Sequence, residues 1–114
     1  MTVSPDDTAD EIGTSSVRTL ATSNLLALCE KATQAAVAEH LSPGIATIGV
    51  QVRLDHVTPS PIGCHVSAQA RLDKVVGKKL HFTISAYDDR GLIAAGKLTR
   101  VMVDEQDFMA KCEG

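Results

Sequence analysis

The sequence predicts an α+β fold in which one long helix lies against a curved antiparallel sheet. Residues 23–41 carry apolar side chains at helical spacing, whereas four later segments alternate apolar and polar residues as strands do. Short turns containing Gly or Asp join the last three of these segments, and such turns make neighbouring strands antiparallel. The strands and the helix are of similar length, so we expect the sheet to curl around the helix.

The helix is bounded by clear start and stop signals. Thr22 or Ser23 is expected to cap its first turn, because a hydroxyl there accepts a hydrogen bond from a free backbone N–H. The Pro-Gly pair at 43–44 ends it. We therefore predict one helix over 23–41.

Charge is scarce along this helix. Between residues 23 and 38 only Glu30 and Lys31 are charged, so the helix is expected to be buried on most sides. A buried carboxylate without a partner is costly or shifts its pKa upward. Glu30 should therefore have a partner or a task, although a solvated helix residue is the simpler interpretation.

The first strand, within residues 47–63, carries the most informative pattern. Its apolar face is predicted to hold Ile48, Val50, Val52 and Leu54, and its polar face Gly49, Gln51, Arg53 and Asp55. His56 falls in phase with the apolar face, just before a Pro-rich turn at 58–61. This phase aims a base that titrates near neutral pH toward the interior. There it is either a core histidine bonded to a carbonyl or a functional group.

Three further strands are expected, at 64–73, 80–86 and 92–103. Turns at 76–78 and 88–91 join them. The phase of the last strand is unclear around Gly96, where we expect a β-bulge. A sheet with a single helix leaves edges and a face exposed, so we expect a homodimer or a higher homo-oligomer.

Composition limits the possible functions. The 114 residues suit one domain over 16–114, preceded by an acidic tail. Residues 1–15 carry four carboxylates and no Lys or Arg, and are expected to be disordered. Aromatics of only 3% and a net charge of −3 argue against a nucleic-acid partner, and no apolar run is long enough to span a membrane. Three cysteines without a C-x-x-C pair favour a reducing cytoplasm.

Short motifs spread over residues 16–111 together resemble one family. They are Ala21-Thr22-Ser23, Leu28-Cys29-Glu30, Ile48-Gly49, Asp55-His56, Thr58 to Gly63, Val76 to Leu80 with Phe82, Gly96 to Arg100, and Phe108 to Lys111. Their order is similar to that of the hotdog-fold acyl-CoA thioesterases, most closely the fluoroacetyl-CoA thioesterase-like group. The resemblance implies a hotdog fold, an acyl-CoA substrate and hydrolysis of its thioester. It implies no separate cofactor, since coenzyme A enters as part of the substrate.

The resemblance also implies the site residues. In the family a Thr at the helix start, a Glu on the helix and a strand His form the catalytic set, and by position these are Thr22, Glu30 and His56. A strand Gly and an Arg of the last strand contact the substrate, which implies Gly49 and Arg100. The fluoroacetyl-specific enzyme has an aromatic-rich lid before the helix, whereas the residues just before the helix here contain no Phe. We therefore expect an acyl group other than fluoroacetyl.

These residues also have structural explanations. Without the resemblance, Thr22 is a helix cap, Gly49 a strand glycine that makes room for the helix, and Arg100 an exposed charge on an edge strand. Three lysines around the turn at 76–78 either bind coenzyme A phosphates or are simply solvated. The other three histidines show no metal-ligand spacing with each other or with the cysteines, so no metal is expected.

Thioester hydrolysis needs an attacking group, a base and a site for an oxyanion. His56 is expected to take a proton from Thr22 or from water, and Glu30 either to orient His56 or to act itself as base or nucleophile. Backbone N–H groups at the helix start or at Gly49 would hold the oxyanion. The sequence leaves covalent and water mechanisms open. The alternative function is a non-catalytic hotdog dimer that binds acyl-CoA or another acyl ligand; a hydratase is disfavoured, because Asp55 and His56 point to opposite faces.

Overall fold

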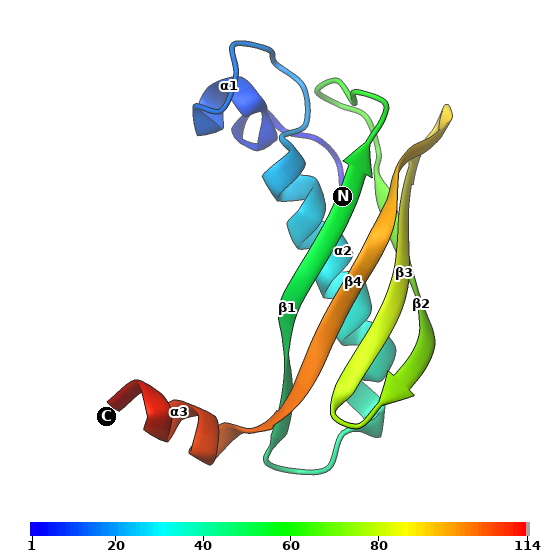
Figure 1. The fold of residues 1–114 in the computed structure, drawn as a ribbon. Helices are drawn as coiled ribbons and strands as arrows, with labels where there is room; N and C mark the ends of the chain where they lie inside the picture. Colours follow the sequence, from blue (N-terminus) through cyan, green and yellow to red (C-terminus); the bar gives the residue numbers. More distant parts are fainter. Residues whose placement is uncertain (114) are drawn as a thin grey trace.

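One long helix packs against a four-stranded sheet in the computed structural model, which describes residues 1–113 (Figure 1). The helices are α1 (Ala9–Ile12), α2 (Thr22–Val37) and α3 (Glu105–Glu113), with short 3-10 helices η1 (Pro5–Asp7) and η2 (Ala38–His40). The strands are β1 (Ile45–His56), β2 (Ser67–Val76), β3 (Lys79–Asp88) and β4 (Gly91–Asp104). The predicted α+β class is confirmed.

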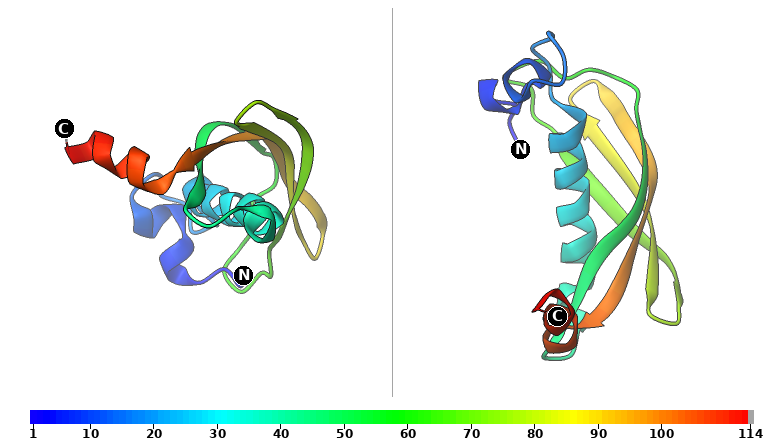
Figure 2. Two further views of the ribbon diagram at one scale, coloured as in Figure 1. Left: turned by 90° about the horizontal axis from the view of Figure 1, so that it is seen from below. Right: turned by 60° about the vertical axis from the view of Figure 1, so that its left-hand side comes forward.

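The sheet has the strand order β1-β4-β3-β2, and every neighbouring pair is antiparallel. Two tight turns close the β2–β3 and β3–β4 hairpins. Seen along the axis of α2, the sheet curves around the helix (Figure 2). The predicted arrangement, a long helix wrapped by a curved antiparallel sheet, is therefore confirmed.

The core lies between α2 and the inner face of the sheet. The helix buries one stripe of residues at helical spacing, namely Leu25, Cys29, Thr33 and Val37. Alternate residues of β3 and β4 meet this stripe, because side chains along a strand point to opposite faces; Phe82, Ile84 and Leu98 are at most 2% exposed. Helix α2 packs chiefly against β2, so the inner face of β1 is only partly covered.

Helix α2 differs from the expectation at its start and in its burial. Its first residue is Thr22, and the N-cap is Ala21, which makes no side-chain cap. The entry to the helix is held instead by the backbone, where the Ala21 N–H donates to the Asp7 carbonyl at 2.8 Å. Glu30 and Ala35 are exposed, because the sheet of one chain covers only one side of the helix. The prediction of a hydroxyl cap and that of burial on most sides are wrong for the single chain.

Strand β1 contains a β-bulge that simple alternation does not predict. Gly49 and Gln51 pair with consecutive residues of β4, so Val50 has no partner there. The extra residue reverses the alternation, and Gly49 faces the helix on the same side as His56. A Cβ placed on Gly49 would lie 3.4 Å from the Glu30 carboxylate. The predicted assignment of Gly49 to the opposite, polar face is therefore wrong.

The bulge predicted at Gly96 is absent. Gly96 pairs in regular register with Leu54 of β1 and Ile84 of β3. A Cβ at this position would collide with the carbonyl oxygen of Arg53. The glycine therefore serves the close approach of two strands and not a change of register.

The N-terminal residues 1–15 are folded onto the domain, in contrast to the predicted disordered tail. The Val3 N–H donates to the Cys64 carbonyl at 2.9 Å, and the Ala9 N–H donates to the Thr19 carbonyl at 2.9 Å. Val3 is 1% exposed and Ala9 8%. A few buried apolar residues and backbone hydrogen bonds hold this segment. The average composition of the segment is acidic, so it did not predict these contacts.

Helix α3 follows β4 without a break and extends away from the sheet (Figure 1). The Asp104 carboxylate accepts a hydrogen bond from the Asp107 N–H at 3.0 Å, which satisfies one free donor of the first turn. The periodicity at the end of the chain did not identify this helix, because it has no fully buried residue to create an apolar stripe.

Candidate active site

Thr22 and His56 meet where α2 begins. Thr22 is the first residue of α2 and His56 is the last residue of β1. The Thr22 hydroxyl lies 2.8 Å from His56 Nδ1, at hydrogen-bond distance. Among the described residues this is the hydrogen bond that the Thr22 hydroxyl makes, so the hydroxyl is available to the imidazole.

The imidazole of His56 is suited to accept a proton near neutral pH. Burial lowers the pKa of His56 below its usual 6.5, an effect that the Thr58 backbone partly opposes. Nε2 of the ring is buried and has no hydrogen-bond partner among the residues that the structure describes. Buried polar atoms are rarely left unpaired, and each exception calls for an explanation such as a catalytic role.

A hollow of about 440 Å³ opens beside this pair. Thr22 and His56 form one side of it together with the turn that follows His56. The rest of the lining comes from Ala9 of α1, from Ser23 of α2 and from the segment between these helices, which contributes Thr14, Ser15, Val17, Thr19 and Leu20. None of the described residues that line the hollow is Phe, Tyr or Trp. The segment just before α2, where the resemblance places an aromatic lid, is therefore present here as a wall without aromatic rings.

Glu30, Gly49 and Arg100 form a second group farther along α2. The position of a Cβ on Gly49 lies 3.4 Å from Glu30 Oε2 and 3.9 Å from Arg100 Nη1. A second hollow of about 210 Å³ is bordered by Glu30, Gly49 and the bulged residues of β1. Glu30 and Gly49 are both exposed, so a ligand can reach them from outside the chain.

Arg100 is buried, contrary to the explanation that treats it as a surface charge: only 7% of it is exposed. It donates from Nε to the Thr47 hydroxyl at 2.8 Å, and from Nη2 to the Thr47 carbonyl at 2.8 Å and the Gln34 amide oxygen at 3.1 Å. Burial lowers the pKa of Arg100, and the charge of Glu30 opposes this. Arg100 therefore ties β4 to β1 and α2, and only its Nη1 side faces Glu30 and Gly49.

The five predicted residues thus form two groups in one chain. Glu30 follows Thr22 by eight residues, which is about 12 Å along a helix at ~1.5 Å per residue. Among the described residues, the hydrogen bond of His56 is to Thr22, and none joins it to Glu30. Glu30 is therefore not in position to orient His56 directly within this chain.

Sequence reasoning missed the residues that hold these groups in place. Gln34 and Thr47 bind the Arg100 guanidinium. Asp88 and Arg90, at the tip of the β3–β4 hairpin, bind the turn that follows His56. The sequence marks Asp88 to Gly91 only as a turn, because its contact with residues some thirty positions earlier depends on the tertiary structure.

Comparison with solved structures defines the class of protein. A fluoroacetyl-CoA thioesterase superimposes with a TM-score of 0.91 and 28% identity, covering 99% of this chain and 88% of the other. A Thermus thermophilus member of the thioesterase superfamily gives 0.92 and 25%, covering 99% and 84%. A hot-dog-like protein from Thermanaerovibrio acidaminovorans gives 0.84 and 26%, covering 98% and 83%. The chain is a hotdog-fold protein of the thioesterase class.

Two sequence comparisons define the family within this class. The model of the Fluoroacetyl-CoA-specific thioesterase family matches residues 3–106. The fluoroacetyl-CoA thioesterase of Streptantibioticus cattleyicolor is 32% identical over 91 residues, which are 80% of this chain and 66% of that protein, just under two thirds of its length. The chain belongs to the fluoroacetyl-CoA-specific thioesterase family.

Proposed function

We propose that this chain hydrolyses the thioester of an acyl-CoA, with Thr22 and His56 at the reacting centre. The observation that carries the proposal is the 2.8 Å contact between the Thr22 hydroxyl and His56 Nδ1, beside an open hollow and in a chain of this thioesterase family. A solved relative has been described in complex with fluoroacetate and CoA, which supports coenzyme A as the carrier.

The chemistry follows from the position of the pair. Neutral His56 takes a proton from the Thr22 hydroxyl or from a water in its place, and the oxygen attacks the thioester carbonyl. The first N–H groups of α2 have no partner within the helix and lie at its positive end, so they favour the developing oxyanion. When the tetrahedral intermediate collapses, the carbon–sulfur bond breaks and the departing CoA sulfur takes the proton from His56. If Thr22 attacks, neutral His56 next takes a proton from water, the water oxygen attacks the acyl ester, and His56 gives that proton to the Thr22 oxygen as the acid leaves.

Glu30, Gly49 and Arg100 are proposed to act on the substrate and not through His56. The missing side chain of Gly49 leaves space in front of the Glu30 carboxylate, which lies 3.4 Å from the Cβ position. Arg100 places a positive charge behind this carboxylate. We propose that the Glu30 carboxylate contacts and orients the substrate there, with Gly49 and Arg100 shaping the space that the substrate enters.

The acyl group is proposed to differ from fluoroacetyl. The described lining of the Thr22–His56 hollow contains no Phe, Tyr or Trp, whereas hydroxyl groups border much of it. Specificity for an acyl group is set by the contacts that line its pocket. The coenzyme A of the substrate is the sole cofactor that the proposal requires.

A thiol-release assay over acyl-CoAs of different length and polarity, fluoroacetyl-CoA among them, tests the proposal. We expect cleavage of at least one thioester, and a loss of about 100-fold or more in kcat/KM in His56→Ala and in Glu30→Ala. His65→Ala and Lys31→Ala, both at exposed positions, are the matched controls and should retain activity. If the wild-type chain binds acyl-CoA in calorimetry but cleaves none, the non-catalytic alternative replaces the proposal.

The oligomeric state and the cellular location of the chain are also proposals. We propose a homodimer or a higher homo-oligomer, supported by the half-covered inner face of β1 and the exposed side of α2. Within residues 1–113 no helix is long and apolar enough to cross a membrane. The three cysteines are free thiols, which supports a cytoplasmic location.

A further inference from the structure

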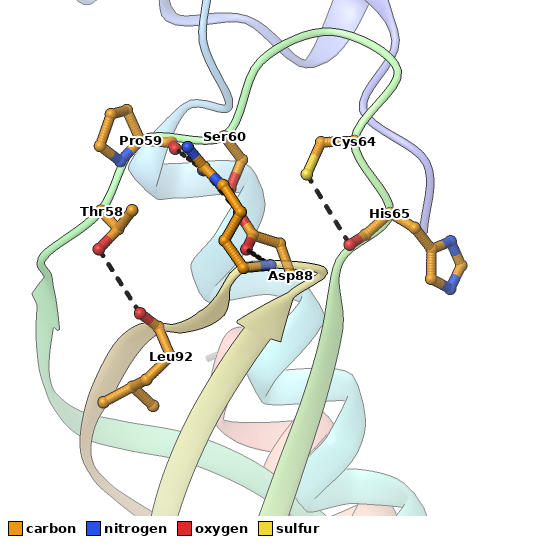
Figure 3. A network of polar contacts seen from close by, with 8 residues as sticks. Thr58, Pro59, Ser60, Cys64, His65, Asp88 and Leu92 are labelled. Atoms are coloured by element: carbon orange, nitrogen blue, oxygen red, sulfur yellow. Dashed lines mark hydrogen bonds and ion pairs between the residues drawn. The ribbon is translucent and has the colours of Figure 1, made fainter.

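The turn after His56 is anchored to the β3–β4 hairpin at nearly every residue. The N–H groups of Val57 and Thr58 donate to the Ile93 carbonyl at 2.8 and 3.2 Å. The Thr58 hydroxyl donates to the Leu92 carbonyl at 3.5 Å, and the Ser60 hydroxyl to Asp88 Oδ2 at 3.2 Å (Figure 3). A Pro-rich loop is thus fixed by a hairpin that is remote in sequence.

Asp88 and Arg90 form the centre of this anchor. Arg90 donates from Nη2 to Asp88 Oδ2 at 2.7 Å and also to the Pro59 carbonyl, while its N–H donates to Asp88 Oδ1 at 2.8 Å. The Asp88 side chain has no exposed surface, and Ser60 is 0% exposed. The hydrogen bond from Arg90 holds the pKa of Asp88 well below its usual range, so the carboxylate stays charged and the anchor intact.

The same turn reaches the segment that leads into α2. The Leu20 N–H donates to the Ser60 carbonyl at 2.9 Å, and Thr19 forms a bridge with Pro61. Leu20 is 2% exposed and precedes Thr22 by two residues. One end of the turn therefore fixes His56, and the other end fixes the approach to Thr22.

We propose that Asp88 and Arg90 are positioning residues for the Thr22–His56 pair, acting through residues 57–61. They touch neither the reacting atoms nor the hollow beside them, but they set the separation of a hydroxyl and an imidazole that must stay within hydrogen-bond distance. The inference rests on the proposed function of that pair. A displacement of about 1 Å at a reacting group costs on the order of 100-fold in rate, so a loosened turn lowers kcat.

The test compares Arg90→Ala, Arg90→Lys and Asp88→Asn with a matched control on β2. Arg71 and Asp73 form an ion pair of the same types and spacing, with Arg71 Nε 2.8 Å from Asp73 Oδ1, on the exposed strand β2. We expect Arg90→Ala to lower kcat about 10-fold or more with KM nearly unchanged, and Arg71→Ala to leave both unchanged. Arg90→Lys should be intermediate, because one ammonium cannot reproduce the fork that binds Asp88 and Pro59 together.

A second measurement does not depend on turnover. Nitrogen NMR of the imidazoles, with His56 assigned by its loss in His56→Gln, reports the hydrogen bond at Nδ1. We expect its resonance to shift in Arg90→Ala and in Asp88→Asn but not in Arg71→Ala. Folded Arg90→Ala and Asp88→Asn with wild-type kcat and unchanged His56 resonances would overturn the inference.

Two further outcomes are also decisive. If Arg90→Ala fails to fold, the isosteric Asp88→Asn decides alone. If the wild-type chain cleaves no thioester, the proposed function fails, and the resonances still decide whether the anchor positions His56.

Discussion

At the scale of single residues, the structure gives the Thr22 side chain a different hydrogen-bond partner from the one that the sequence predicts. Its hydroxyl is the expected helix cap, yet the backbone of Asp7 holds the preceding residue and no side chain caps the helix. The hydroxyl is bonded to His56 instead. Glu30, which was expected to be buried, is exposed in the single chain. Its proposed role rests on Gly49 and Arg100, which lie beside its carboxylate.

The state of His56 leads to a prediction for the pH dependence of activity. Burial lowers the pKa of His56 below 6.5, and the proposed base must be neutral. We therefore expect kcat/KM to stay on its plateau as the pH falls through 6.5 and to decline with a single-proton slope only at more acidic pH. The measurement is a pH–rate profile under conditions where the fold is intact by circular dichroism.

The same shift predicts a loss of stability on the acid side. As the pH falls below 6.5, the unfolded chain binds a proton at His56 that the folded chain resists. The free energy of unfolding therefore decreases with falling pH over that range through this group. For the activity prediction above, an inflection of the pH–rate profile at or above pH 6.5 would contradict the buried environment assigned to His56.

At the scale of elements, two glycines of neighbouring strands serve opposite purposes. Gly49 lies at the bulge of β1, where the extra residue Val50 turns it toward Glu30. Gly96 lies in a regular stretch of β4, where the backbone of Arg53 leaves no room for a side chain. One glycine therefore opens a site, and the other permits two strands to pack.

Alanine substitution separates these two purposes. In Gly49→Ala the new Cβ lies 3.4 Å from Glu30 Oε2 and 3.9 Å from Arg100 Nη1, which is ordinary contact, so the fold should persist while kcat/KM falls by about 10-fold or more. In Gly96→Ala the collision with Arg53 is with backbone, so we expect a loss of about 3 kcal/mol or more in stability. Urea unfolding followed by kinetics on the folded fraction makes the comparison. Equal stability of the two variants would refute it.

At the scale of the whole molecule, one side of the fold, formed by β1 and one face of α2, is left uncovered. Strand β1 is at an edge of the sheet, and its apolar residues Val50 and Val52 are 52% and 42% exposed. The side of α2 that carries Glu30 and Ala35 is also exposed. Uncovered apolar surface beside an unpaired strand edge is typical of an interface between copies.

A sedimentation experiment tests the expected self-association. We expect the wild-type chain to sediment at about twice its mass of 12.0 kDa or more, and Val52→Lys to shift it toward the monomer, because the charge would be buried without a partner. Val76→Lys is the matched control, since Val76 is 56% exposed on β2 at the opposite edge. A wild-type monomer, or dissociation by Val76→Lys alone, would show that β1 is not the interface.

The sequence by itself determined the long helix, the four strands of the sheet and the residue types of the candidate site. Apolar spacing identified α2, alternation identified the strands, and the resemblance located Thr22, Glu30, His56, Gly49 and Arg100. These features are local, because helical and strand periodicities are properties of consecutive residues.

The tertiary structure alone decided which of these residues meet. The bulge that turns Gly49 toward Glu30, the burial of Arg100 and the anchor of Asp88 and Arg90 on the turn after His56 all depend on pairing between distant segments. A one-residue change of register reverses every side chain beyond it, and nothing in the neighbouring residues records where the partner strand will place that change. For this reason the sequence proposed the members of the candidate site, and only the fold divided them into a Thr22–His56 pair and a Glu30 group.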